Sequence, residues 1–151
     1  GEYTENSNVA MKNFVDVEGS GQDITTINCA CSSNFDASSA VISATGVTAE
    51  IRYLTINNTG GSNAASFGVY TNGVVDGSFS MLHVTATATG GTNNAGVYND
   101  VSSSPSMTDV IATASGGTNN YGVHNDESSP TIRNSSITGT TASIYNIGTG
   151  I

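Results

Sequence analysis

Acidic and histidine side chains recur at matching places along this chain. His83 and Asp109 belong to one such series, which Tyr53 opens and Asn134 closes. A His–Asp pair is part of a catalytic group when it activates a nucleophile, but no serine or cysteine partner is identifiable for this pair. We therefore expect a polar pair without catalysis, and we interpret the protein as not an enzyme.

Asp100 and Asp126 form a second acidic series, in which Asn72 is the first member. Two carboxylates one above the other repel unless a cation or a proton intervenes. A Ca²⁺ ion held by carboxylates and carbonyls is one solution, and simple hydration at the surface is the other. We predict hydration and no cofactor, with Ca²⁺ at Asp100 and Asp126 as the alternative.

An aromatic ring follows a valine or isoleucine in four units of the sequence. These rings belong to Tyr70, Tyr98, His124 and Tyr145. On a strand whose valine points inward, the next residue points outward, so we expect an exposed aromatic column. Such a column either packs on itself at a solvated face or binds a ligand, and a glycan or a partner protein is the ligand we expect.

Asparagine comes next in three of these units, at Asn99, Asn125 and Asn146, with Thr71 in the first. If these side chains turn inward at a bend, each amide can bond the amides above and below it. We predict a structural asparagine ladder.

These series exist because the chain repeats, and the repeat determines which elements position the side chains. The segment 90–94, Gly-Gly-Thr-Asn-Asn, returns at 116–120, and Gly-Val-Tyr-Asn-Asp at 96–100 returns with one change at 122–126. Two apolar series follow the repeat: Val41, Val69, Val97, Val123, Ile144; and Ile51, Met81, Met107, Ile132. Their steps vary in length, which indicates that turns change while strands stay in register.

Short stretches such as 84–89 alternate apolar and polar residues with period two, which is typical of strands. No segment has a helical period. The prediction is an all-β protein, a right-handed parallel β-helix (solenoid) of about five coils with roughly 25–30 residues each. We expect one domain over residues 1–151.

The composition excludes several functions. The net charge is −9 with only three Lys and Arg residues, and phosphate contacts need such cations, so we predict no nucleic-acid binding. No apolar run approaches 18 residues, so we predict no membrane insertion. We interpret Cys29 and Cys31 as two small buried side chains, because on one strand their disulfide would close a tight ring. The sequence leaves their redox state open.

The segment Ser129–Ser135, the Gly-Val-Tyr-Asn units and the opening residues 1–27 carry a resemblance to a known family. The chain resembles the pectin-lyase-like right-handed parallel β-helix superfamily, and most of all its bacterial surface and secreted β-helix repeat proteins. This resemblance implies an extracellular or cell-surface location. Lyases of the superfamily use clustered aspartates with an Arg or Lys base, and its polygalacturonases use short Asp and His motifs; neither pattern is present here.

The two ends of the repeat show no capping pattern at 1–6 or 148–151. Uncapped solenoids expose strand edges and core, so either the chain is a fragment of a longer one or the ends stack head to tail into a fibre. We predict an extracellular structural or adhesive module that associates with itself through its ends. The alternative is a carbohydrate-binding or polysaccharide-degrading β-helix that uses the aromatic column.

Overall fold

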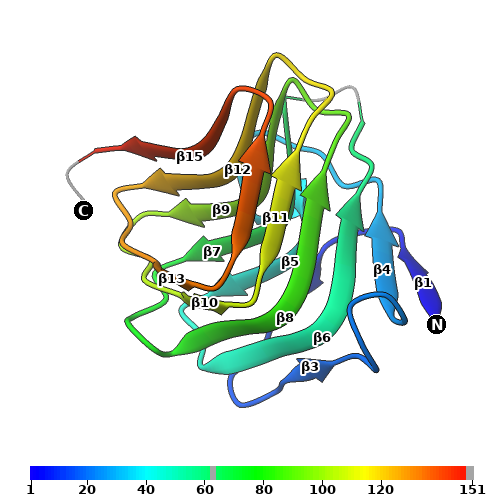
Figure 1. The fold of residues 1–151 in the computed structure, drawn as a ribbon, viewed down its shortest axis with the longest axis vertical. Coiled ribbons are helices and arrows are strands. Elements are labelled where there is room, and N and C mark those ends of the chain that lie inside the picture. Colours follow the sequence, from blue (N-terminus) through cyan, green and yellow to red (C-terminus); the bar gives the residue numbers. More distant parts are fainter. Residues whose placement is uncertain (62–63, 149–151) are drawn as a thin grey trace.

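The chain winds as a parallel β-solenoid of about five turns, as the computed structural model in Figure 1 shows for residues 1–61 and 64–148. Its strands pair in parallel throughout the named elements, and no α-helix occurs in these two ranges. The predicted fold class, an all-β solenoid of stacked coils, is therefore confirmed.

Three columns of hydrogen-bonded strands run along the solenoid. The first column contains β3 (Val17–Glu18), the first halves of β6 (Ala49–Asn58) and β8 (Phe79–Ala88), β10 (Ser106–Thr108) and β13 (Thr131–Arg133). The second contains β1 (Glu2–Glu5), β4 (Thr26–Cys29), the second halves of β6 and β8, β11 (Ile111–Ala114) and β14 (Ser136–Gly139). The third contains β2 (Val9–Ala10), β5 (Ala40–Thr45), β7 (Ala65–Asn72), β9 (Asn93–Asp100), β12 (Asn119–Asp126) and β15 (Ala142–Ile147).

In four successive coils, the first and second columns meet at a corner made by one left-handed residue. Along β6 and β8 buried and less buried residues alternate, but the alternation slips by one at Tyr53 and at His83. Both have positive φ, 56° and 50°, and so do Asp109 and Asn134, 53° and 48°. The slip keeps apolar side chains inside on both halves of the bent strand, which explains why this series recurs in the sequence.

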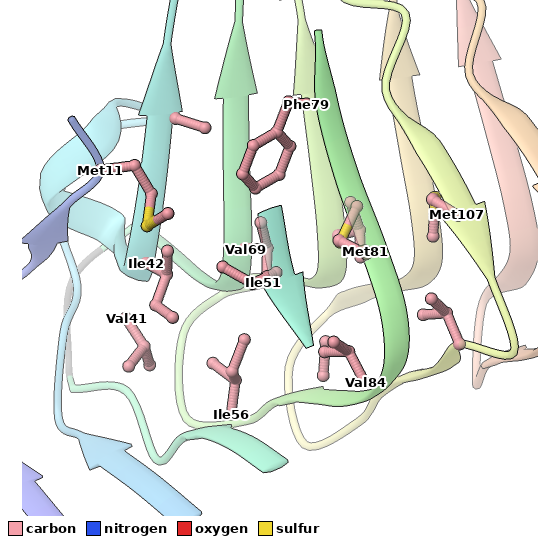
Figure 2. Close-up of a cluster of buried hydrophobic side chains, with 14 of the residues drawn as sticks. Met11, Val41, Ile42, Ile51, Ile56, Val69, Phe79, Met81, Val84 and Met107 are labelled. Carbon is pink, nitrogen blue, oxygen red and sulfur yellow. The ribbon is translucent and has the colours of Figure 1, made fainter. Parts of the chain in front are cut away.

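The core consists of apolar side chains stacked on their counterparts in the next coil (Figure 2). Ile51, Met81 and Met107 are in register, as the sequence predicts, and each is at most 1% exposed. The other predicted series is wrong in its first member, because Val69 pairs with Ile42 instead of Val41. Val41 and Ile42 are adjacent in the sequence and both are fully buried. The sequence pattern therefore does not show which of the two is in register with Val69.

The repeated Gly-Gly-Thr-Asn-Asn segments form the turns between the second and third columns. Gly90 has φ of +87°, and a Cβ on it would collide with the backbone oxygen of Thr59, so only glycine fits there. The buried Asn94 closes the same turn: its Oδ1 accepts from the Gly91 N–H (2.9 Å), and its Nδ2 donates to the Gly91 oxygen (3.0 Å). Asn120 repeats both contacts with Gly117.

Candidate functional site

The four predicted aromatic residues lie together on the outer face of the third column. Tyr70, Tyr98, His124 and Tyr145 come from β7, β9, β12 and β15, which are in register. The Tyr70 and Tyr98 rings stack at 5.8 Å. His124 packs edge-on against Tyr98 at 4.6 Å and against Tyr145 at 5.0 Å. The sequence therefore predicts their neighbourhood correctly.

Their predicted exposure is wrong for three of the four. Tyr70, Tyr98 and His124 are 5–7% exposed, and only Tyr145, at 38%, is open to solvent. A second apolar layer covers the two tyrosines: Phe67 stacks on Tyr98 at 4.6 Å and on Tyr70 at 6.3 Å, and Phe35 packs against both Phe67 and Tyr98. His124 packs instead against Tyr98, Tyr121 and Tyr145. Phe35 and Phe67 were not predicted, because Phe35 lies in a segment without repeat motifs and Phe67 occupies a place where the two adjacent coils have alanine.

Tyr121 is the ring that sequence reasoning missed on the accessible side of this cluster. It stacks on Tyr145 with centroids 4.5 Å apart and 10° between the ring planes. Tyr121 is partly exposed, and burial raises its pKa, with a smaller contribution from Tyr145. The stacked Tyr121–Tyr145 pair is therefore the part of the predicted column that a ligand can reach.

The two carboxylates of the acidic series, Asp100 and Asp126, accept hydrogen bonds from the hydroxyls of the buried tyrosines. Asp100 Oδ2 accepts hydrogen bonds from the Tyr70 hydroxyl (2.5 Å) and from Asn72 Nδ2 (2.9 Å). Burial, with the Asp100 hydrogen bond second, raises the pKa of Tyr70 to about 12. The Tyr98 hydroxyl donates more weakly to Asp126, at 3.4 Å. Each carboxylate therefore accepts a hydrogen bond from the tyrosine one coil earlier.

The alternative of a Ca²⁺ site at Asp100 and Asp126 gains no third acidic or histidine side chain from the described residues. Within residues 1–61 and 64–148, no three His, Cys, Asp or Glu side chains gather in a way that would hold a metal ion. Asp100 also accepts from the Val101 N–H, at 3.0 Å through Oδ1. Both oxygens of Asp100 thus have protein donors, which makes this carboxylate a poor start for a cation site.

Side-chain hydrogen bonds form the asparagine ladder that the sequence predicts. Asn99 Nδ2 donates to Asn125 Oδ1 and Asn125 Nδ2 donates to Asn146 Oδ1, both at 2.8 Å. Thr71 Oγ1 donates to Asn99 Oδ1 at 2.8 Å and so begins the ladder. Asn99 and Asn125 are buried, so the ladder satisfies amides that water does not reach.

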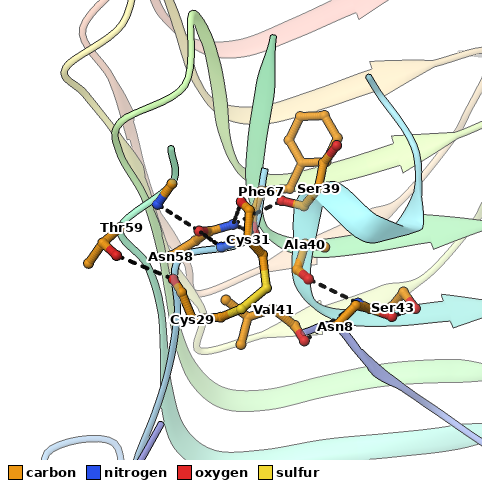
Figure 3. The surroundings of a disulfide bond; sticks show 11 residues. Asn8, Cys29, Cys31, Ser39, Ala40, Val41, Ser43, Asn58, Thr59 and Phe67 are labelled. Atoms are coloured by element: carbon orange, nitrogen blue, oxygen red, sulfur yellow. Dashed lines mark hydrogen bonds between the residues drawn. A yellow bond between two sulfur atoms is a disulfide. The ribbon is translucent and has the colours of Figure 1, made fainter. Parts of the chain in front are cut away.

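Cys29 and Cys31 are buried, as expected, but they form a disulfide instead of two free thiols (Figure 3). The prediction failed because it placed both on one strand, whereas β4 ends at Cys29 and the chain turns there. Asn58 holds the turn: its Oδ1 accepts from the Cys31 N–H (3.1 Å) and its Nδ2 donates to the Cys31 oxygen (2.9 Å). The buried Asn58 was not predicted to have a role.

The expected polar pair at the corner is present. His83 Nε2 and Asp109 Oδ2 are 3.7 Å apart, with 43% and 35% of their side chains exposed, and the Tyr53 ring stacks on His83 at 5.3 Å. Gln22 Nε2 reaches the Asp109 backbone oxygen at 3.4 Å. Among the described residues, the interactions of the His83 side chain are this contact with Asp109 and the stacking with Tyr53.

Among residues 1–61 and 64–148, the first and the last strand of each column has one unpaired edge. At the N-terminal end, β1, β2 and β3 each pair on one edge only, and they surround a hollow of about 330 Å³ lined partly by Tyr3, Val9 and Val17. At the C-terminal end, β13, β14 and β15 likewise pair on one edge, beside a hollow of about 370 Å³ that Ile132 and Ile144 line. Tyr3 is 56% exposed and Ile144 is 45% exposed.

Comparisons with known proteins identify no relative. No family model, no curated protein and no solved structure matches the chain. Among the described residues there is also no helix with the length and apolar character needed to cross a membrane.

Proposed function

We propose that the protein is a non-catalytic extracellular structural or adhesive module, a right-handed β-helix of the pectin-lyase-like kind, that assembles end to end. One observation carries the proposal: among residues 1–61 and 64–148, the first and last strand of each column has one unpaired edge, with exposed apolar side chains such as Tyr3 and Ile144 beside it. Unpaired strand edges readily accept another strand. A contact between two different surfaces of identical copies repeats into an open filament.

The disulfide supports the extracellular part of this proposal. Disulfides persist in oxidising compartments outside the cytosol, and Cys29 and Cys31 form one in this protein. The low count of charged residues, 10% of the chain, is also compatible with a rod whose sides bear mainly Ser, Thr and Asn.

Electron microscopy and sedimentation of the purified chain, over a concentration series, test the assembly. We expect filaments with an axial repeat of about 29 Å, because the second and third columns each stack six strands at roughly 4.8 Å. Parallel samples with Ca²⁺ and with a chelator test the calcium alternative, since only a calcium-bound module would assemble differently in the two. Dispersed particles at every concentration would contradict the proposal.

A second candidate function is carbohydrate recognition, which the Tyr121–Tyr145 pair favours. Sugars stack on exposed aromatic rings because one side of a pyranose presents C–H groups. The pair offers partly exposed rings on the side of the solenoid, away from the covered Tyr70 and Tyr98.

A glycan array tests this candidate. We expect binding that Tyr121→Ala and Tyr145→Ala each reduce by roughly tenfold, about 1.4 kcal/mol. Tyr53→Asn is the matched control, because it removes a surface ring from a corner where asparagine tolerates the positive φ. The candidate is wrong if no glycan binds, or if the control weakens binding as much as the two variants.

A further inference from the structure

The outer face of the second column is a regular array of small polar side chains. Strands β4, β6, β8, β11 and β14 stand side by side in Figure 1 and pair residue by residue. Buried and less buried residues alternate along the paired part of β6, β8, β11 and β14, so every second side chain points outward. The outward side chains form three rows, which together are termed the hydroxyl face: Thr26, Thr55, Thr85, Ile111 and Ser136; Asn28, Asn57, Thr87, Thr113 and Thr138; and Thr59, Thr89, Ser115 and Thr140.

The hydroxyl face carries no charge, although the protein as a whole is strongly acidic. Eleven of its 14 side chains are threonine or serine, and nine of the 20 threonines of the chain belong to it. The acidic residues that give the net charge of −9 all lie elsewhere. The array stops at β1, where Glu2 is in register with Thr26. Because charged groups are costly to remove from water, an uncharged face is suited to close contact with a neutral surface.

The backbone holds these side chains at fixed positions. Strands β6, β8 and β11 are hydrogen-bonded on both edges, and the branched threonine side chain is stiff. Thr87 Oγ1 donates to Asn57 Oδ1 at 2.7 Å, and Asn57 Nδ2 donates to Asn28 Oδ1 at 3.0 Å. The hydroxyls of Thr85 and Thr113 have no hydrogen-bond partner among residues 1–61 and 64–148, so they are available to a ligand.

The spacing of the hydroxyl face determines which ligand fits it. Neighbouring coils are about 4.8 Å apart, and successive outward residues on one strand are about 6.6 Å apart. A ligand that uses the whole face therefore has to repeat in two directions, which a single sugar chain or peptide does not do. The surface of an ice crystal repeats in two directions at intervals of this size. Each of its oxygen atoms both donates and accepts hydrogen bonds, as a threonine hydroxyl does.

We propose that the hydroxyl face binds ice. Threonine hydroxyls take the place of water molecules at the crystal surface, while the threonine methyl groups and Ile111 cover the spaces between them and exclude liquid water. The centre of the site lies on β8, β11 and β14, because the Gln22 backbone oxygen accepts a hydrogen bond from Thr55 Oγ1 and the loop before β4 covers that edge. This binding uses the side of the solenoid, so it is separate from assembly through the ends and from the Tyr121–Tyr145 pair.

Microscopy of single ice crystals under controlled cooling tests the proposal. We expect the original chain to produce faceted crystals and thermal hysteresis, which is a gap between the melting and the freezing temperature of a crystal. Thr113→Tyr, which places a ring in the middle of the hydroxyl face, removes both effects. Thr131→Tyr is the matched control, because it makes the same change at an exposed position of β13 in the first column; it leaves the hysteresis unchanged.

Partition of fluorescently labelled protein into slowly growing ice is a second, independent measurement. The original chain and Thr131→Tyr are enriched in the ice, whereas Thr113→Tyr stays in the liquid. Circular dichroism of each variant verifies folding. If Thr113→Tyr does not fold, Thr138→Tyr replaces it, because Thr138 is an exposed member of the same row on β14.

Three results overturn the proposal. The first is round crystals without hysteresis for the original chain at millimolar concentration, and the second is an equal loss in Thr113→Tyr and Thr131→Tyr. The third is binding to microcrystalline cellulose that Thr113→Tyr removes, without any effect on ice, since it would identify a polysaccharide crystal as the ligand. The ice measurements need no filaments, so a chain that never assembles contradicts the proposed function alone.

Discussion

His124 is buried among aromatic rings, and its Nε2 has no hydrogen-bond partner in the described structure. Burial lowers its pKa to about 4, although the nearby carboxylates of Asp126 and Asp100 act in the opposite direction. The folded protein therefore prefers neutral His124, whereas the unfolded chain binds a proton near the ordinary pKa of about 6.5.

This preference predicts a pH-dependent stability. The contribution of His124 is fully present above about pH 6.5 and is lost as the pH falls toward 4. Between pH 7.5 and pH 5 the loss amounts to about 2 kcal/mol in the free energy of unfolding. Urea unfolding at several pH values measures it, with His124→Tyr as comparison, since tyrosine occupies this position in adjacent coils. If the free energy of unfolding falls equally with pH in the original protein and in His124→Tyr, the assignment to His124 is wrong.

The turns between strand columns depend on glycine to different degrees from coil to coil. Gly90 and Gly116 share a φ of +87°. A Cβ on Gly90 would strike the Thr59 backbone, while one on Gly116 would meet nothing closer than 3.7 Å. The two positions thus separate the cost of the backbone angle from the cost of a collision.

We expect Gly116→Ala to destabilise the protein by about 1 kcal/mol, which is the cost of a left-handed angle alone. Gly90→Ala should cost about 3 kcal/mol or more, because the backbone of the adjacent coil has to move as well. Denaturant unfolding of both variants measures the difference. Equal losses would mean that the coils separate easily at this turn.

Strand register was predictable from the sequence because apolar residues such as Met81 and Met107 must enter the same core in successive coils. The corner residues were also found, as a recurring series, although their left-handed angles were not. The covering of the aromatic cluster was not predictable, because Phe35 belongs to a segment that occurs once. The disulfide was missed for a related reason: the end of β4 at Cys29 is set by contacts from Asn58 in the next coil.

On the scale of the whole molecule, each coil is stabilised mainly by the coils directly above and below it. The end coils have one such neighbour, and their side chains are correspondingly exposed, as at Ile144 and Tyr145. Stability should therefore be lowest at the ends and highest at the middle of the rod.

Hydrogen exchange measured by mass spectrometry tests this gradient. In dilute samples, amides of β13, β14 and β15 should exchange at least tenfold faster than those of β7 and β9. Above the concentration at which filaments form, the end strands should slow toward the rate of the middle. Uniform exchange across all coils in dilute solution would indicate one cooperative unit.

The turns between the third and first columns lie along one side of the rod and differ in length, while the strands beside them keep their register. Gly46, Gly73 and Gly77 in these turns have open space around them, because a Cβ added at any of the three would meet no atom within 4 Å. Peptides grafted at these turns would be held in a row at multiples of about 4.8 Å. The fold can thus display epitopes or enzymes at a distance that is set by the number of coils between the two grafted turns.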